Sequence, residues 1–338
     1  MTFRYATLSN LLQNNVVFRE LNPLDPSLPN FEALKKELNL QSLPRKKDKE
    51  YAKVLYRILK SAKDFSNIVY IGDTFLSDLT VIKNLKEYAN EPVFGVITSE
   101  GTPLPENHDT FVVFNDKWAN LPALVEDKIG GNSLVVIDLD KTFIGANGRN
   151  HLPIDKARTD AIVALGENIF EAPNREEFLN LYQKIHSKEF LAFTEDNQDI
   201  VSILTLIIYS SVVSFEEFAR FTKTGTFEEF INKIDVKEPL LTYVDEVRNN
   251  LKLNMPTLFP TFRKIELEKT VGRMDFLPVD TPLDALLSEE ILITGEVYEV
   301  VDRALKKGAT LFGVSDKPEI ASFNDNISIL SQRMKIYP

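Results

Sequence analysis

Continuous apolar runs alternate along the chain with stretches of helical periodicity. Four short runs are apolar almost without a break, which is typical of strands buried on both faces of a parallel sheet. They cover residues 68–71, 93–97, 134–137 and 310–314. Apolar positions at helical spacing, which indicate amphipathic helices, cover residues 51–62, 79–88, 121–129 and 297–307. Because strands and helices alternate, we predict a doubly wound α/β fold around a mainly parallel sheet.

The middle of the chain follows a different pattern. Residues 154–230 have helical patterns with no strand signal, and residues 237–287 are rich in proline and threonine. For the second stretch we predict a return path of turns with a short strand or two. We therefore expect a mainly helical domain over residues 146–287, inserted between two pieces of one α/β core, residues 1–145 and 288–338.

The most apolar segment is too short to cross a membrane. Residues 200–213 are interrupted by serine and threonine, and they fall short of the roughly 20 residues that a spanning helix needs. We interpret this run as a buried helix and expect no membrane partner. The first 21 residues mix Asn, Gln and Arg through their apolar positions, so they lack the core of a signal peptide. We therefore expect a cytoplasmic location.

Composition narrows the classes of function. The chain has 338 residues, 43% hydrophobic and 26% charged, which is the make-up of an ordinary folded protein with about two domains. Its formal net charge of −11 disfavours nucleic acid as a partner, because such binding needs a cationic face. The absence of cysteine from the sequence excludes disulfides, thiolate zinc sites and cysteine nucleophiles.

Polar side chains follow three of the four apolar runs, at the point where each predicted strand ends. They are Asp138, Asp140 and Thr142 after residues 134–137, Asp73 and Asp78 after residues 68–71 and Gly72, and Ser315 and Lys317 after residues 310–314. Open α/β sheets bind ligands at the carboxyl ends of their strands. Gathered there, the four aspartates would suit a hard cation such as Mg²⁺. Without a cation they would repel one another and raise their own pKa values.

Three of these segments together resemble the motifs of the haloacid dehalogenase-like (HAD) superfamily. The apolar strand that ends in Asp138-Leu-Asp-Lys-Thr142 is similar to its nucleophile motif, Asp-x-Asp-x-Thr. Gly72, Asp73 and Asp78 are similar to its acidic metal motif, and residues 311–315 are similar to its apolar strand ending in Ser or Thr. The family usually has the acidic motif last, whereas here it precedes the nucleophile. A circular permutation would explain this order.

The permuted order also accounts for the two ends of the chain. Residues 44–51, Pro-Arg-Lys-Lys-Asp-Lys-Glu-Tyr, lead into a predicted helix and resemble the stretch that joins the family's Lys motif to its acidic motif. The resemblance covers residues 44–145 and roughly 295–325. It implies a Rossmann-like HAD core, with residues 146–287 as the family's cap domain.

The resemblance implies a role for each aspartate. Asp138 would be the nucleophile that attacks phosphorus and forms an aspartyl-phosphate. Asp140 would be the general acid toward the leaving alcohol and then the general base toward water. Mg²⁺ would be held by Asp138, Asp73 and Asp78, together with the backbone carbonyl of Asp140.

The resemblance also implies roles for groups that contact the phosphate. Ser315 would donate a hydrogen bond to a phosphoryl oxygen, and a cation would stabilise the charge of the intermediate. Four basic residues are candidates for this catalytic cation: Arg45, Lys46, Lys47 and Lys317. Thr142 and Lys317 are the candidates for substrate binding.

We therefore expect a Mg²⁺-dependent phosphatase that hydrolyses a phosphate monoester of a small molecule. The small substrate is expected because a large cap shuts out bulky phosphoproteins. Two alternatives stay open, a non-catalytic HAD-fold binding protein and a phosphotransferase or phosphomutase of the same fold, and the sequence leaves the oligomeric state open. A structure with Asp73, Asp138 and Ser315 on non-adjacent strands would contradict this interpretation.

Overall fold

The computed structural model describes residues 3–337 and comprises two compact units. The α/β unit contains the described residues up to Asp155 and from Thr270 onward, and the helical unit contains residues 156–269. Both boundaries fall inside helices, α6 (Leu152–Ile169) and α13 (Pro260–Val271). The helical unit is therefore shorter at each end than the predicted insertion.

The α/β unit is built on a six-stranded sheet of order β2-β7-β6-β3-β4-β5, in which every pair of neighbours is parallel. The strands are β2 (Val16–Val17), β7 (Thr310–Val314), β6 (Ser133–Asp138), β3 (Asn67–Gly72), β4 (Val93–Thr98) and β5 (Val112–Asn115). The four predicted strands are confirmed, and all four are almost wholly buried, as continuous apolar runs require. The two edge strands were not predicted. β2 has only two residues, and the centre of β5 is half-buried, so neither strand has the burial of the four predicted strands over a comparable length.

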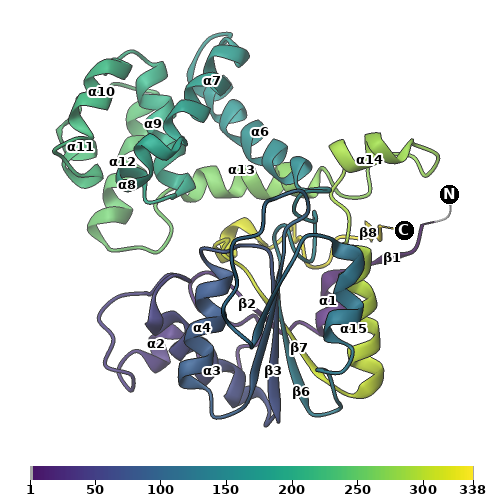
Figure 1. The fold of residues 1–338 in the computed structure, drawn as a ribbon. Coiled ribbons are helices and arrows are strands. Elements are labelled where there is room, and N and C mark those ends of the chain that lie inside the picture. The colour runs from purple at the N-terminus through teal and green to yellow at the C-terminus, as the bar shows by residue number, and fades with distance from the viewer. Residues whose placement is uncertain (1–2, 338) are drawn as a thin grey trace. The chain divides into compact units, whose positions relative to one another are not determined.

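Helices cover both faces of this sheet, which confirms the predicted α/β architecture (Figure 1). α3 (Lys49–Ala62) and α4 (Asp78–Tyr88) share one core cluster with side chains of β3, β6 and β7. α1 (Leu8–Leu12) and α15 (Gly295–Lys307) lie on the opposite face. α15 ends at Gly308, whose φ of 87° is the left-handed conformation that suits a helix C-cap.

The remaining elements of the α/β unit are short. They are α2 (Phe31–Leu34), a 3₁₀ turn (Trp118–Asn120), α5 (Leu121–Val125), α14 (Leu283–Glu289), a second 3₁₀ turn (Glu319–Ala321) and an antiparallel pair, β1 (Tyr5–Ala6) with β8 (Met334–Lys335). The helix predicted over residues 121–129 is thus shorter than expected. The β1–β8 pair brings segments from near the two ends of the chain side by side.

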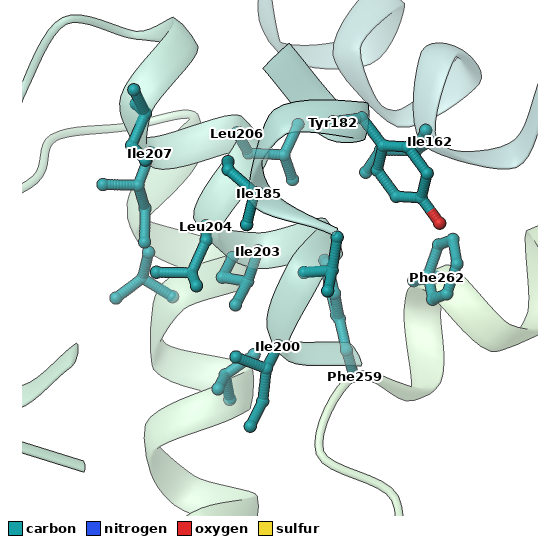
Figure 2. Packing of buried hydrophobic residues seen from close by; sticks show 14 of the residues in the cluster. Ile162, Tyr182, Ile185, Ile200, Ile203, Leu204, Leu206, Ile207, Phe259 and Phe262 are labelled. Carbon is teal, nitrogen blue, oxygen red and sulfur yellow. The ribbon is translucent and has the colours of Figure 1, made fainter. Parts of the chain in front are cut away.

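The helical unit packs around α9 (Gln198–Tyr209), in which every residue but the last is buried. Figure 2 shows Ile203 and Leu204 of this helix among the apolar side chains of the core, with Phe259 and Phe262 from the region of α13 nearby. The other helical elements of the unit are α7 (Arg175–Ile185), a 3₁₀ turn (Lys188–Phe190), α8 (Leu191–Thr194), α10 (Phe215–Phe221), α11 (Phe227–Lys233) and α12 (Leu240–Lys252). The predicted buried helix is confirmed. Among the helices of residues 3–337, none combines the length and apolar character that a bilayer crossing requires.

The prediction of a short strand or two within residues 237–287 is wrong. Helices α12 and α13 lie in this segment instead, and α14 begins in it. Pro239 and Pro282 precede α12 and α14, and Pro260 is the first residue of α13. Proline suits a helix start, because its φ is already close to the helical value and the first turn does not use its missing N–H. These prolines therefore mark helix starts, where we had predicted turns.

Candidate functional site

Three neighbouring strands bring predicted site residues to one edge of the sheet. β6 lies between β3 and β7, and the three strands are parallel, so their carboxyl ends lie at the same edge. Asp138 is the last residue of β6, while Asp73 and Ser315 directly follow β3 and β7. These three residues therefore lie at the carboxyl ends of adjacent strands, as the sequence interpretation requires.

Asp73, Asp78 and Asp138 form a buried carboxylate cluster. One oxygen from each lies within 4.8 Å of those of the other two, and this is the one such group of potential metal ligands within residues 3–337. Asp78 is the first residue of α4, and it approaches β3 so closely that a Cβ on Gly72 would lie 2.6 Å from the Asp78 Cβ. Glycine at this position therefore allows the two acidic residues to meet.

Lys46 is the cation of this cluster. Its ammonium group is buried, 2.5 Å from Asp138 Oδ1, 3.0 Å from Asp78 Oδ1 and 3.5 Å from Oδ2 of the exposed Asp316. Burial alone would lower the pKa of Lys46, but Asp138, Asp316 and Asp78 outweigh it and raise this pKa well above its ordinary value. Lys46 is therefore positively charged at neutral pH.

The other basic candidates lie elsewhere. Arg45 is half-buried and donates its backbone N–H to Asp48 Oδ2 at 2.7 Å, while Lys47 is exposed. Lys317 contacts Asp140, with 3.2 Å between Lys317 Nζ and Asp140 Oδ1. Lys46 thus contacts Asp138, whereas Lys317 contacts Asp140.

Asp78 is held by several hydrogen-bond donors. Its Oδ1 accepts from Tyr70 Oη at 2.9 Å as well as from Lys46, and its Oδ2 accepts from Thr74 Oγ1 at 2.7 Å. The backbone N–H groups of Thr74 and Asp73 also donate to Oδ2, at 3.1 and 3.3 Å. Burial would raise the pKa of Asp78, but Lys46 and these side-chain hydrogen bonds outweigh it and lower the pKa. Asp78 therefore stays ionised.

Burial and negative neighbours raise the pKa of the other two carboxyl groups. For Asp138, burial is the largest cause, and Asp78 and Asp73 add to it; Lys46 acts against them, yet the pKa lies well above its ordinary value. For Asp73, burial and Asp78 raise the pKa to about 7. Three carboxyl groups thus share one buried ammonium group, and full ionisation leaves excess negative charge.

This donor set fits a hard divalent cation. Carboxylate oxygens are the ligands that Mg²⁺ prefers, and Mg²⁺ commonly binds through one or two carboxylates. Its charge would offset the excess negative charge of the cluster and lower the pKa values that burial raises. Asp73, Asp78 and Asp138 are the side chains that would hold it.

Asp140 lies outside this trio and has its own partners. Its Oδ2 accepts from Ser315 Oγ at 3.4 Å, and its Oδ1 lies near Lys317 Nζ. Ser315 is fully buried, and its hydroxyl oxygen accepts from the Lys317 N–H at 3.0 Å. Asp140, Ser315 and Lys317 therefore form a second polar group, built from residues that follow β6 and β7.

Thr142, a predicted substrate-binding residue, lies next to Asp73. It is fully buried, and its hydroxyl donates to Asp73 Oδ1 at 3.4 Å. Its carbonyl accepts from Thr294 Oγ1 at 2.6 Å. These contacts support a carboxylate of the cluster.

Four further residues that contact the cluster were not identified from the sequence: Tyr70, Thr74, Asn147 and Asp316. Thr74 lies between the two acidic residues and Asp316 follows Ser315, so proximity to the motifs was an available signal for both. Tyr70 looks like one more apolar strand residue, and Asn147 lies in a glycine-rich turn. Only the folded structure reveals these two.

Comparison of this chain with protein-family models, with curated proteins and with solved structures finds no match.

Proposed function

We propose that this protein is a Mg²⁺-dependent phosphatase that uses HAD-like chemistry in a permuted motif order and acts on a phosphate monoester of a small molecule. The contact between Lys46 and Asp138, 92 residues apart, carries the proposal. The permuted order requires this contact, because it assigns the Lys motif to the start of the chain and the nucleophile to its middle.

The order of the strands supports the same proposal. Asp73, Asp138 and Ser315 lie at the carboxyl ends of β3, β6 and β7, and these three strands are consecutive in the sheet. Residues 156–269 form a separate helical unit between two parts of the α/β unit, as the insertion of a cap domain requires. Such a cap is our reason to propose a small substrate.

Asp138 is the proposed nucleophile. One of its carboxylate oxygens attacks phosphorus, the bond from phosphorus to the ester oxygen breaks, and Asp140 gives a proton to the departing alcohol. Water then attacks the phosphorus of the aspartyl-phosphate, and Asp140 accepts the proton of that water. The bond between phosphorus and the Asp138 oxygen breaks, which releases inorganic phosphate and regenerates Asp138.

Three other side chains stabilise the negative charge of the phosphoryl group in this proposal. Lys46 supplies a fixed positive charge beside Asp138, and Ser315 and Lys317 supply donors beside Asp140. When bound, Mg²⁺ would draw charge from the phosphoryl oxygens and reduce their repulsion of the carboxylate nucleophile.

The test is Mg²⁺-dependent release of phosphate from an aryl phosphate and from a panel of sugar and nucleotide monophosphates. Asp138→Asn should reduce kcat at least about 1000-fold, because it removes the nucleophile. Asp127→Asn is the matched control, since Asp127 is an exposed aspartate of the same unit, and it should leave kcat unchanged.

Two other results would redirect the proposal. Measurable Mg²⁺ binding without hydrolysis of any substrate would favour the non-catalytic binding protein. Transfer of phosphate to added alcohols in preference to water would favour a phosphotransferase. Full activity of Asp138→Asn would contradict the proposed nucleophile.

A further inference from the structure

Asp73 accepts a hydrogen bond from a loop to which the proposed chemistry assigns no role. Asn147 lies nine residues after Asp138, and its Nδ2 donates to Asp73 Oδ2 at 2.8 Å. The other oxygen, Oδ1, accepts the longer bond from Thr142 Oγ1, at 3.4 Å. Asn147 is thus the closer of these two side-chain donors to Asp73.

Three hydrogen bonds hold the backbone of Asn147. Its carbonyl accepts from Trp118 Nε1 at 2.9 Å and from the Glu100 N–H at 3.3 Å, and its own N–H donates to the Lys141 carbonyl at 2.7 Å. Trp118 is fully buried, so the indole donor is itself held in place by packing. The amide of Asn147 is therefore presented to Asp73 from a rigid support.

The next residue shows how tightly this loop is packed. Gly148 has a φ of 82°, and a Cβ on it would lie 1.8 Å from the Glu100 carbonyl oxygen. Any larger residue would push the loop away from the segment that follows β4. A loop this constrained is suited to hold a neighbouring side chain in one orientation.

We infer that Asn147 is a positioning residue for the proposed cation site, which orients the Asp73 carboxylate so that Oδ1 is presented to Mg²⁺. This inference rests on the proposed function only for the identity of the cation. A neutral amide suits the role, because it binds Oδ2 without adding a positive charge that would compete with Mg²⁺. Groups that orient metal ligands in this way typically change metal affinity by about 10- to 100-fold.

The test measures binding of Mg²⁺ alone, by isothermal titration calorimetry on the full chain. Asn147→Ala should weaken Mg²⁺ binding at least about tenfold. Asn132→Ala is the matched control, because Asn132 is exposed and immediately precedes β6, at the end opposite to Asp138. It should leave the Kd unchanged.

Activity then separates positioning from a loss of structure. If the proposed phosphatase activity is present, Asn147→Ala should require more Mg²⁺ for half-maximal rate but approach the wild-type kcat at saturating Mg²⁺. A purely structural role would lower the Tm in EDTA without changing the Kd for Mg²⁺.

A second variant keeps the inference testable if Asn147→Ala does not fold. Trp118→Phe keeps a buried ring but removes the donor to the Asn147 carbonyl. It should also weaken Mg²⁺ binding, by a smaller factor than Asn147→Ala does. A Kd within twofold of wild type in Asn147→Ala would overturn the inference, as would the absence of Mg²⁺ binding by the wild type. If the wild type binds Mg²⁺ without phosphatase activity and Asn147→Ala weakens that binding, the proposed function fails while the inference holds.

Discussion

Each of the two units contains a buried cluster of charged side chains. The two clusters differ in how far their positive and negative charges balance. In the helical unit, Arg263 Nε donates to Asp199 Oδ1 at 2.5 Å and its NH1 donates to Glu266 Oε2 at 2.7 Å. Arg158 Nε donates to the other oxygen of Glu266 at 3.3 Å. Asp199, Glu266 and Arg263 are almost completely buried. These four side chains carry two positive and two negative charges, so the charges of the four balance.

The cluster at the sheet edge of the α/β unit has no such balance. Asp73, Asp78 and Asp138 share the buried Lys46, and the pKa values of Asp73 and Asp138 are raised. Buried charges are costly unless they are paired. The charges of the balanced cluster are paired within it, whereas the excess negative charge of the unbalanced cluster fits the cation that we propose.

The largest expected effect on stability is in the balanced cluster. Arg263→Met should lower the free energy of unfolding by about 3–5 kcal/mol, because it leaves Asp199 and Glu266 buried without their common partner. Urea denaturation monitored by circular dichroism measures this loss. If Arg263→Met were as stable as wild type, the balanced cluster would not have the structural role that the comparison assigns to it.

Addition of Mg²⁺ should have the next largest effect on stability. Mg²⁺ should act only by binding to the unbalanced cluster. At a concentration of 100 times its Kd, a ligand that binds only the folded state stabilises it by about 2.7 kcal/mol. Mg²⁺ should therefore raise the Tm of wild type and of Arg263→Met, while EDTA reverses the shift. The shift should vanish in Asp138→Asn, and an equal shift in that variant would place the cation elsewhere.

The pH dependence of stability is a smaller and sharper test. The pKa of Asp73 is about 7 in the folded protein, against 3.8 for an unperturbed aspartate, so the folded state binds more protons than the unfolded state between these values. This contribution to stability is fully present below the unfolded pKa and is lost as pH rises through the folded pKa. In EDTA, the Tm should therefore fall as pH rises from 5 to about 8, and Asp138, whose pKa is also raised, should act in the same direction.

Asp73→Asn should make this dependence shallower, because the amide does not titrate. Asp127→Asn, the exposed control, should keep the wild-type slope. Excess Mg²⁺ should oppose the fall, since it binds the ionised cluster. An equal slope in wild type and Asp73→Asn would show that Asp73 has no raised pKa.

The central strands and the acidic edge of the sheet were predictable from local patterns. Strands β3, β4, β6 and β7 are buried on both faces, so their sequences are continuously apolar. Asp73, Asp138 and Ser315 could then be placed together, because residues that follow neighbouring parallel strands share one edge. Helix α9 was predictable for a similar reason, since it is buried almost all round.

The other features of the site and of the fold depend on tertiary packing, which local sequence patterns do not reveal. Arg45, Lys46 and Lys47 are equivalent in sequence, and only the way in which the segment before α3 packs brings Lys46 to Asp138. The contact of Asn147 with Asp73 depends on the support of Trp118, in a distant segment. The prolines of residues 237–287 were ambiguous because proline is common both in turns and at helix starts.

The most direct test of the proposed nucleophile needs no knowledge of the substrate. Beryllium trifluoride binds to a carboxylate oxygen and mimics a phosphoryl group attached there, and ¹⁹F NMR detects the bound form. With Mg²⁺, wild type and Asp127→Asn should show a bound fluoride signal, which should be absent in EDTA and in Asp138→Asn. A bound signal that persists in Asp138→Asn, or that forms equally well without Mg²⁺, would contradict the assignment of Asp138 as a Mg²⁺-assisted nucleophile.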